Sequence, residues 1–131
     1  MIAEPAGRVV KRIFLIDDEA EMTQLAGSLL KFSGFQVETA NDPVAGLARL
    51  LNEDFDAIVI DLMMLPLDGH SLLRQLRESP RHSETPIIVL SAKSLDGDER
   101  KSLLLSKVRY LPKPVSPSRL VQIVRDSVKK A

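Results

Sequence analysis

Residues that can do chemistry follow directly after the short apolar runs of this chain. Asp17 and Asp18 follow the first run, Asp61 the third, Ser91 the fourth and Lys113 the fifth. Three ionised carboxylates within a few ångströms of one another repel, so a site built from them needs a counter-cation or must hold a proton. Oxygen ligands without neighbouring His or Cys favour a hard ion, and Mg²⁺ suits one to three carboxylates with water completing the octahedron.

With a lysine and a hydroxyl added, carboxylates and a metal ion suit phosphoryl chemistry. Mg²⁺ and Lys113 would neutralise phosphoryl oxygens, Ser91 would donate to one of them, and a carboxylate would be the nucleophile. The chain has no glycine-rich phosphate loop or Walker pattern, which argues against a nucleotide at these residues. FMN on a flavodoxin-like fold fits poorly, because its phosphate loop would meet the acidic stretch 17–19.

Each of these residues also has a purely structural interpretation. Asp17 or Asp18 can cap a helix that begins near Glu19, and Ser91 can cap the next helix along. Asp61 can be a turn residue and Lys113 an exposed loop lysine. Capping explains none of their mutual placement, so we favour one shared site.

The elements that must position these residues are strands alternating with helices. The apolar runs cover residues 13–16, 35–37, 57–60, 87–90 and 110–111. The first, third and fourth are continuous and rich in Ile and Val, as expected of strands buried on both faces. Five β–α units with short connections predict an α/β fold, a doubly wound five-stranded parallel sheet with five helices.

Helical spacing of apolar residues separates the runs. The first stripe comprises Met22, Leu25, Leu29 and Phe32, and the second comprises Val44, Leu47, Ala48 and Leu51. Gly34 is expected to stop the first helix, and Asp42-Pro43 to supply the N-cap and first position of the second.

Three further helices follow the same logic. The third starts near Asp68 and stops before Pro80, the fourth runs over residues 98–107, and Ser116-Pro117 caps the fifth. The core stripe of the third comprises Leu72, Leu73 and Leu76, and that of the fifth comprises Leu120, Val121, Val124 and Val128.

In an open α/β sheet, ligands bind beyond the carboxyl ends of the strands, where the strand order reverses. With the order 2-1-3-4-5, the reversal falls between strands one and three. The three aspartates then converge there, with Ser91 and Lys113 approaching from the far side. The second strand ends in Glu38-Thr39-Ala40 and is expected to contribute nothing comparable.

Composition narrows the class of protein. The 131 residues fit one domain, residues 11–131, behind a loose lead-in over residues 1–10. The chain has no cysteine, which excludes a disulfide framework, a thiolate metal site and a catalytic thiol, and fits a reducing cytoplasm. Its net charge is zero, which predicts no bulk attraction to nucleic acid, and no apolar stretch is long enough for a membrane helix.

Four fragments together resemble one family. They are FLIDDE at 14–19, IVIDLMMLPLDG at 58–69, VLSAK at 89–93 and YLPKPV at 110–115. In this order and spacing they resemble a bacterial response-regulator receiver domain of the chemotaxis-regulator type, over nearly the whole chain.

The resemblance implies a two-component phosphorelay switch. Asp61 would accept a phosphoryl group from a sensor histidine kinase or a histidine phosphotransfer protein. Asp18 and Asp61 would ligate Mg²⁺ directly with the Met63 carbonyl, and Asp17 mainly through water. Ser91 and Lys113 would hold the phosphoryl group, and Ser91 and Tyr110 would reposition on activation.

Two stretches depart from the family pattern. Family members usually have a proline four residues after the acceptor; this chain has Leu65 at that position, and Pro66 comes one residue later. Ser106-Lys107 replaces the usual Gly-Ala before the fifth strand, which puts the end of the fourth helix in question, because glycine normally relieves a left-handed cap there.

Output is expected through the face of helix four, strand five and helix five. Leu103, Leu104 and Leu105 are consecutive and span roughly 200° of a helix, whereas a core stripe covers about 100°. At least one should be exposed or meet a partner, unless a short, irregular helix buries all three. Lys107, Arg109 and Arg119 lie beside them in this prediction. The partner would be a downstream protein, an attached output domain or, after phosphorylation, a second copy of the chain.

Two other classes of protein are considered. A pseudo-receiver would use the fold without phosphorylation, but all five site positions are intact. An aspartate-nucleophile phosphatase would need D-x-D after the first strand, where this chain has Asp17-Asp18-Glu19. We therefore expect a regulatory domain and not an enzyme. His70 and His82 are expected at the solvated surface.

Overall fold

The computed structural model describes residues 10–61, 69–91, 97–105 and 107–128. The strands are β1 (Arg12–Ile16), β2 (Gln36–Ala40), β3 (Ala57–Asp61), β4 (Ile87–Ser91) and β5 (Arg109–Pro112). The helices are α1 (Ala20–Phe32), α2 (Pro43–Asn52), α3 (Gly69–Glu78), α4 (Gly97–Leu105) and α5 (Pro117–Val128). Among the described residues, no helix is long and apolar enough to cross a membrane.

The strands form one parallel sheet in the order β2-β1-β3-β4-β5, which confirms the predicted fold class. Its register is level at the carboxyl ends. Ile16 lies opposite Ala40 and Ile60, and Asp61 lies opposite Leu90. The residues that follow these strands therefore meet along one edge.

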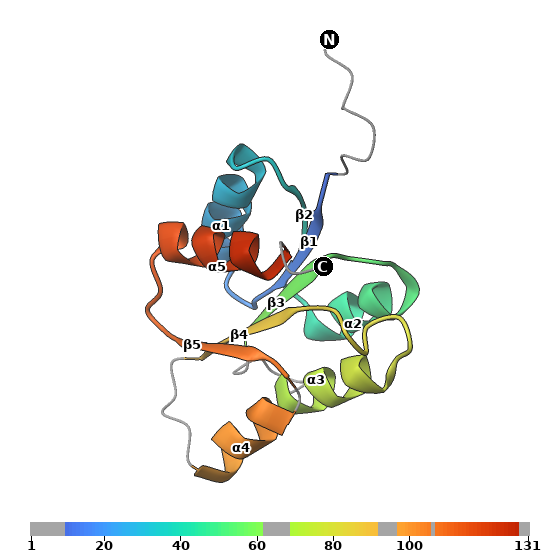
Figure 1. The fold of residues 1–131 in the computed structure, drawn as a ribbon. Helices are drawn as coiled ribbons and strands as arrows, with labels where there is room; N and C mark the ends of the chain where they lie inside the picture. The colour runs from blue at the N-terminus through green and yellow to red at the C-terminus, as the bar shows by residue number, and fades with distance from the viewer. Residues whose placement is uncertain (1–9, 62–68, 92–96, 106, 129–131) are drawn as a thin grey trace.

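Helices cover both faces of the sheet, with α1 and α5 on one face and α2, α3 and α4 on the other (Figure 1). Along β1, Phe14 and Ile16 pack toward α2 and α3, while Ile13 and Leu15 pack toward α1 and α5. Burial of both faces explains why the strands read as continuous apolar runs.

The predicted core stripe of α1 is wrong for Leu25 and Phe32, although Leu29 is half-buried and packs against the core. The residues that α1 buries are Thr23, Ala26, Gly27 and Leu30, whereas Leu25 and Phe32 are 53% and 91% exposed. The buried face is built from small residues, which let the helix come close to the sheet. A Cβ at Gly27 would lie only 3.5 Å from Thr39 Cγ2.

The stripe of α2 is also displaced, with Leu47 and Leu50 buried but Val44 and Leu51 exposed. The cause is Gly46, where a Cβ would lie 2.9 Å from Ile16 Cδ1. The helix therefore rests its glycine face on β1 and turns its larger flanking residues outward.

The stripes of α3 and α5 are confirmed, since every residue predicted for them is buried. The caps are confirmed as well. Asp42 accepts a hydrogen bond from the Val44 amide, and Ser116 Oγ accepts one from the Arg119 amide. Gly34 ends α1 with φ of 102°.

The turn after α4 passes through Lys107, the second residue of the pair that replaces Gly-Ala. Lys107 takes the left-handed conformation, with φ of 58°. The Val108 amide donates back to the Leu103 carbonyl at 3.4 Å, as in a Schellman cap. A lysine thus occupies the conformation that glycine adopts without strain, while Ser106 lies outside the described residues.

The prediction that His82 is a solvated surface residue is wrong, because the side chain is fully buried. Its Nε2 lies 2.6 Å from the Leu50 carbonyl and 3.0 Å from the Glu53 carbonyl, and its Nδ1 lies 3.0 Å from Thr85 Oγ1. The ring satisfies carbonyls that the end of α2 leaves without helical partners, which a sequence pattern cannot reveal. The side chain of His70 lies outside the described residues.

Candidate functional site

Asp17 is held at the carboxyl end of β1 by the backbone around it. Its amide donates to the Ala40 carbonyl at 3.2 Å, which extends the pairing with β2 by one residue. Its Oδ1 accepts from the Glu19 amide at 2.9 Å. The Asp17 side chain is therefore buried and fixed, whereas Asp18 and Glu19 are exposed.

Asn41 supports this turn from the neighbouring strand β2. Its Nδ2 donates to the Asp17 carbonyl at 2.7 Å and to Thr23 Oγ1, in α1, at 3.0 Å. The second strand adds no carboxylate to the cluster among the described residues, but Asn41, the residue after it, positions the turn that carries Asp17. The available signal was a polar residue directly after a strand, at the same edge as the aspartates.

Lys113 joins the acidic residues to the far side of the sheet. Its amide donates to the Ser91 carbonyl at 2.8 Å, which fixes the residue beside β4. Its Nζ lies 3.1 Å from Asp61 Oδ2, 3.2 Å from Asp17 Oδ2 and 3.5 Å from Glu19 Oε1. Asp61, the last residue of β3, is only 4% exposed. The ammonium therefore bridges two buried carboxylates.

One lysine faces more than one carboxylate at this site, and the pKa values of Asp17 and Lys113 reflect this. Burial, above all, raises the pKa of Asp17 above its ordinary value, and the charge of Asp61 adds to this. The Glu19 amide and Lys113 act in the opposite direction. For Lys113, burial lowers the pKa, but the hydrogen bond to Asp61 and the charges of both carboxylates outweigh it, so the pKa is raised. The lysine stays charged, and the carboxylates still gain from further positive charge.

Four carboxylates converge on one point of this edge. Asp17, Asp18, Glu19 and Asp61 each place one oxygen within 4.8 Å of the others. An all-oxygen donor set with waters able to enter from the exposed side suits a hard divalent cation. Glu19 joins the predicted aspartates in this cluster. Met63, predicted to offer a carbonyl, lies outside the described residues.

The two predicted switch residues lie in β4 and β5. Ser91 is fully buried at the end of β4, opposite Pro112 in the register. Tyr110 is half-buried and packs against the core cluster under α2, α3 and α4. Lys113 thus contacts both Asp17 and Asp61, with Ser91 at the same edge and Tyr110 further back in β5.

The predicted output face is only partly described. Leu103 is buried, and the side chains of Leu104 and Leu105 lie outside the described residues. Lys107 is exposed just before β5, Arg109 is exposed at the start of β5, and Arg119 is exposed on α5.

A doubly wound parallel sheet with an acidic cluster, a half-buried lysine and a buried hydroxyl at its carboxyl edge defines the class of protein. The family model of the response regulator receiver domain matches residues 13–125, and the chain belongs to this family. It is a phosphoacceptor domain of two-component signalling and not a conventional enzyme.

Individual relatives agree with this assignment. The chain is 32% identical over 122 residues to the transcriptional regulatory protein CpxR homolog of Haemophilus influenzae, covering 93% of this chain and 52% of the relative. It therefore spans about half the length of this curated relative.

Solved structures show the same fold. The CheY-like receiver domain protein of Methanospirillum hungatei JF-1 superposes with a TM-score of 0.85 at 24% identity, covering 93% of this chain and 96% of that one. The receiver domain of the sensor histidine kinase PA1611 of Pseudomonas aeruginosa PAO1 has a TM-score of 0.80 at 27% identity, covering 92% and 99%. That structure has a magnesium ion coordinated in its active-site cleft.

Proposed function

We propose that Asp61 is the residue that accepts the phosphoryl group. The observation that carries the proposal is the bridging Lys113 ammonium, 3.1 Å from Asp61 and 3.2 Å from Asp17. Asp17 is held by the Glu19 amide through Oδ1 and by Lys113 through Oδ2, and we assign it the role of orienting the site. In the transfer, a carboxylate oxygen of Asp61 bonds to phosphorus as the bond to the donor histidine nitrogen breaks.

We further propose that the carboxylate cluster holds Mg²⁺, as the cleft of the PA1611 receiver does. Asp18 and Asp61 would be direct ligands with the Met63 carbonyl, and Asp17 would act mainly through water. A bound divalent cation supplies positive charge to the phosphoryl oxygens, and Lys113 and Ser91 complete their coordination.

The phosphodonor is a sensor histidine kinase or a histidine phosphotransfer protein, and a groove beside Lys113 supports docking of such a protein. The groove runs between the start of α1 and the turn after β5 and has a volume of about 510 Å³. Met22, Leu25 and Val115 line it with apolar surface. Leu25 is 53% exposed there, which a docked helix would cover.

The signal leaves through the face of α4, β5 and α5 in this proposal. Ser91 would move toward the phosphoryl group and Tyr110 would move inward, which shifts a pre-existing equilibrium. The receiver unit is residues 11–131, in the cytoplasm, and its output is a downstream protein, an attached output domain or a phosphorylation-dependent homodimer. Transcriptional regulators of about twice this length among its relatives favour the attached domain.

Labelling with a small phosphodonor and Mg²⁺ tests the assignment of Asp61. Intact mass should increase by one phosphoryl group, and Asp61→Asn should abolish the increase. The matched control is Asp98→Asn, at an exposed acid of α4, which should label like the parent protein. Unchanged labelling of Asp61→Asn would refute the assignment of Asp61 as the acceptor. A folded parent protein that takes no label would favour the alternative of a pseudo-receiver that works without phosphorylation.

A further inference from the structure

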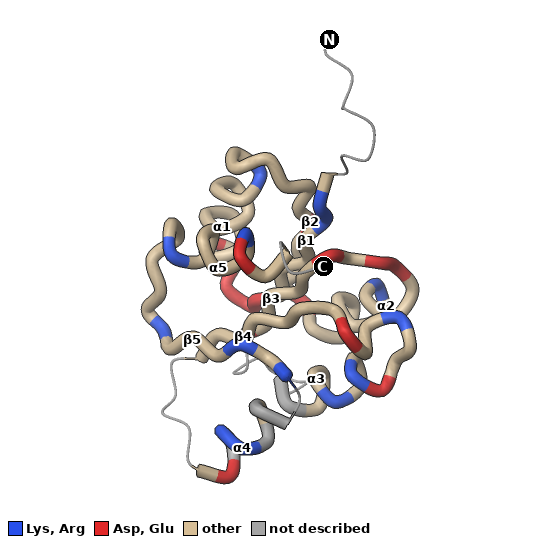
Figure 2. The backbone as a smooth tube through the Cα atoms, viewed as in Figure 1, with Lys and Arg blue, Asp and Glu red and all other residues tan. Residues whose placement is uncertain are grey.

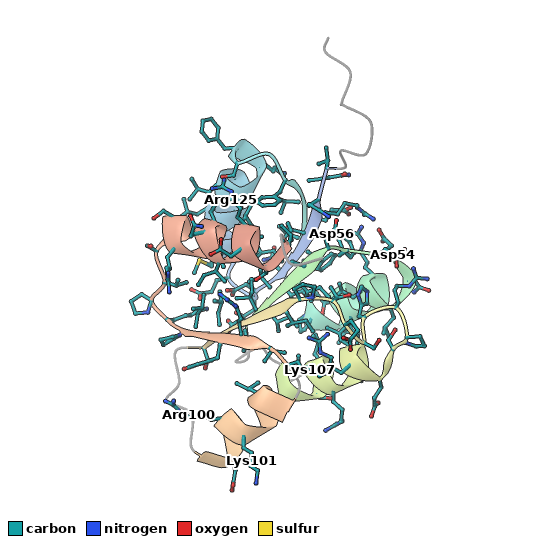
Figure 3. All side chains as sticks on the ribbon, in the orientation of Figure 1. Asp54, Asp56, Arg100, Lys101, Lys107 and Arg125 are labelled. Atoms are coloured by element: carbon teal, nitrogen blue, oxygen red, sulfur yellow. The ribbon has the colours of Figure 1, made fainter. Side chains whose placement is uncertain are left out.

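The outward face of α1 carries a stripe of apolar residues that the core does not bury. We call it the α1 stripe, and its members are Met22, Leu25, Leu29 and Phe32. Leu25 and Phe32 are 53% and 91% exposed, and the other two are half-buried at its border. Within the described part of the chain, α1 packs against β1, β2 and α5. Helix α5, on which Figure 3 labels Arg125, lies beside α1 and leaves the stripe open to solvent.

The spacing of the α1 stripe is that of a helix that pairs with another helix. Its members are separated by three, four and three positions, like the a and d positions of a coiled-coil seam. Single exposed apolar side chains are common on protein surfaces, but a continuous seam is not explained by the fold of one copy. The groove proposed for the phosphodonor includes only Met22 and Leu25. Phe32 lies ten residues beyond Met22, about 15 Å further along the helix.

Charges near the two ends of the α1 stripe indicate what covers it. Glu21 and Lys31 are the only charged residues of α1, which is tan over most of its length in Figure 2. Both are exposed, and neither forms an ion pair with any described residue. A second α1 helix running antiparallel would bring Glu21 of each copy near Lys31 of the other. Parallel helices would bring like charges together.

An antiparallel pair related by a two-fold axis also matches the α1 stripe to itself. With the axis near Gly27, Met22 lies opposite Phe32 of the second copy, and Leu25 lies opposite Leu29. A two-fold interface requires this kind of self-complementary surface. Contact between the thioether of Met22 and the ring of Phe32 is favourable in itself.

The area of such a pair indicates how strongly it holds. An aromatic side chain buries about 150–250 Å², so the two copies of Phe32 contribute roughly 300–500 Å². The leucines and methionines add to this, although Met22 and Leu29 are already half-buried. The total lies near the lower end of interface sizes, about 1,200 Å² or less, where contacts are transient. We therefore expect a pair that forms at high protein concentration and separates on dilution.

We propose that the α1 stripe is a homodimer interface in which the α1 helices of two copies pack antiparallel. This interface is separate from the face of α4, β5 and α5 that is proposed for output. Met22 and Leu25 also line the groove proposed for the phosphodonor, so the dimer hides that groove. This last consequence rests on the proposed function, whereas the pairing of the helices does not.

Sedimentation equilibrium of the unphosphorylated chain in EDTA, up to millimolar protein, tests the pairing without any phosphoryl transfer. The average mass should rise toward that of a dimer, and Phe32→Glu should weaken association at least tenfold. The matched control is Val44→Glu, at an apolar residue of α2 that is 55% exposed, which should associate like the parent. Melting temperatures check that both variants remain folded.

Single cysteines test the direction of the helices, because the chain has no cysteine of its own. Ser28 and Glu21 are both exposed and lie seven residues apart, on the same side of the α1 stripe. Ser28→Cys places a thiol close to the two-fold axis, so a short bismaleimide should crosslink it to its counterpart. Glu21→Cys places a thiol about 18 Å from its counterpart along the helix axis, so it should not crosslink.

Two results would overturn the homodimer. One is a chain that stays monomeric at every concentration, which would leave the α1 stripe to a different protein. The other is an equal loss of association in Phe32→Glu and Val44→Glu, which would show general attraction between apolar surfaces. Equal crosslinking of Ser28→Cys and Glu21→Cys would overturn the antiparallel arrangement.

Discussion

Replacing Lys113 with methionine removes the ammonium and keeps an unbranched side chain of similar length. In the folded protein, that ammonium contacts Asp17 and Asp61, which are 2% and 4% exposed. Removing one partner of a buried ion pair costs about 3–5 kcal/mol, because the remaining charge stays buried. We expect Lys113→Met to lower the free energy of unfolding by about 3 kcal/mol. This is the lower end of that range, because the exposed residues Asp18 and Glu19 leave the site open to water on one side.

The sign of the pH dependence follows from the two shifted groups. The raised pKa of Lys113 means that its stabilisation is fully present below 10.5 and is lost as pH rises through the folded-state value. The raised pKa of Asp17 means that its ionised form costs stability above the folded-state pKa, and this cost disappears as pH falls toward 3.8. Lys113→Met should therefore cost most at neutral pH and less in acid.

Urea denaturation followed by far-UV circular dichroism, in EDTA at neutral and acidic pH, measures the effect. Lys31→Met, at an exposed lysine of α1, is the matched control and should change little. Mg²⁺ at a hundred times its dissociation constant should stabilise the parent by roughly 2.7 kcal/mol, and the variant has more to gain from occupancy. If Lys113→Met is as stable as the parent in EDTA at neutral pH, or costs the same in an Asp17→Asn background, our account of the bridging ammonium fails.

Three further changes probe separate parts of the structure. Asp17→Asn should raise the free energy of unfolding in EDTA by on the order of 1 kcal/mol, because one buried charge is removed. It should also weaken Mg²⁺ binding at least tenfold. Denaturation measures the first effect and calorimetric titration the second, and a loss of stability in EDTA would contradict the prediction. Lys107→Gly should stabilise the fold by up to about 1 kcal/mol by relieving the left-handed backbone, with a lower melting temperature as the contrary result. His82→Phe keeps the ring but leaves the Leu50 carbonyl without its donor, so denaturation should show a loss of about 1–3 kcal/mol, and an unchanged midpoint would mean that water replaces the histidine.

The sequence sufficed for the features that depend on local pattern. Continuous apolar strands, the alternation with helices and the strand-end positions of Asp17, Asp61 and Lys113 all follow from residue type and spacing. These positions converge because the carboxyl ends of parallel strands share an edge, which is a property of the fold and not of any one residue.

Features that depend on close packing could not be predicted from the sequence. A hydrophobicity pattern scores Leu25 and Phe32 as core residues and cannot see that a helix may instead bury its small side chains. In α2, the approach of Gly46 to Ile16 sets the orientation and displaces the stripe.

Hydrogen bonds between segments far apart in the chain could not be predicted from the sequence either, for a related reason. His82 reaches the Leu50 carbonyl across 32 residues, and Asn41 reaches Asp17 across 24. Such partners are defined only once the segments are packed, so the polar character of these residues suggested exposure or no role at all.

The lysine that bridges the carboxylates also has a consequence for folding. Lys113 lies 96 residues from Asp17 and 52 from Asp61, and it reaches both from the turn after β5, an edge strand that pairs with β4. Contacts of such long range form only after the loops between them have closed. A chain still emerging from the ribosome without β5, or a folding intermediate in which that strand is undocked, has the acidic residues but no ammonium between them. If Asp61 is the acceptor, as proposed, competence to accept a phosphoryl group would arise only when the last strand has docked, and incomplete chains would stay silent in signalling.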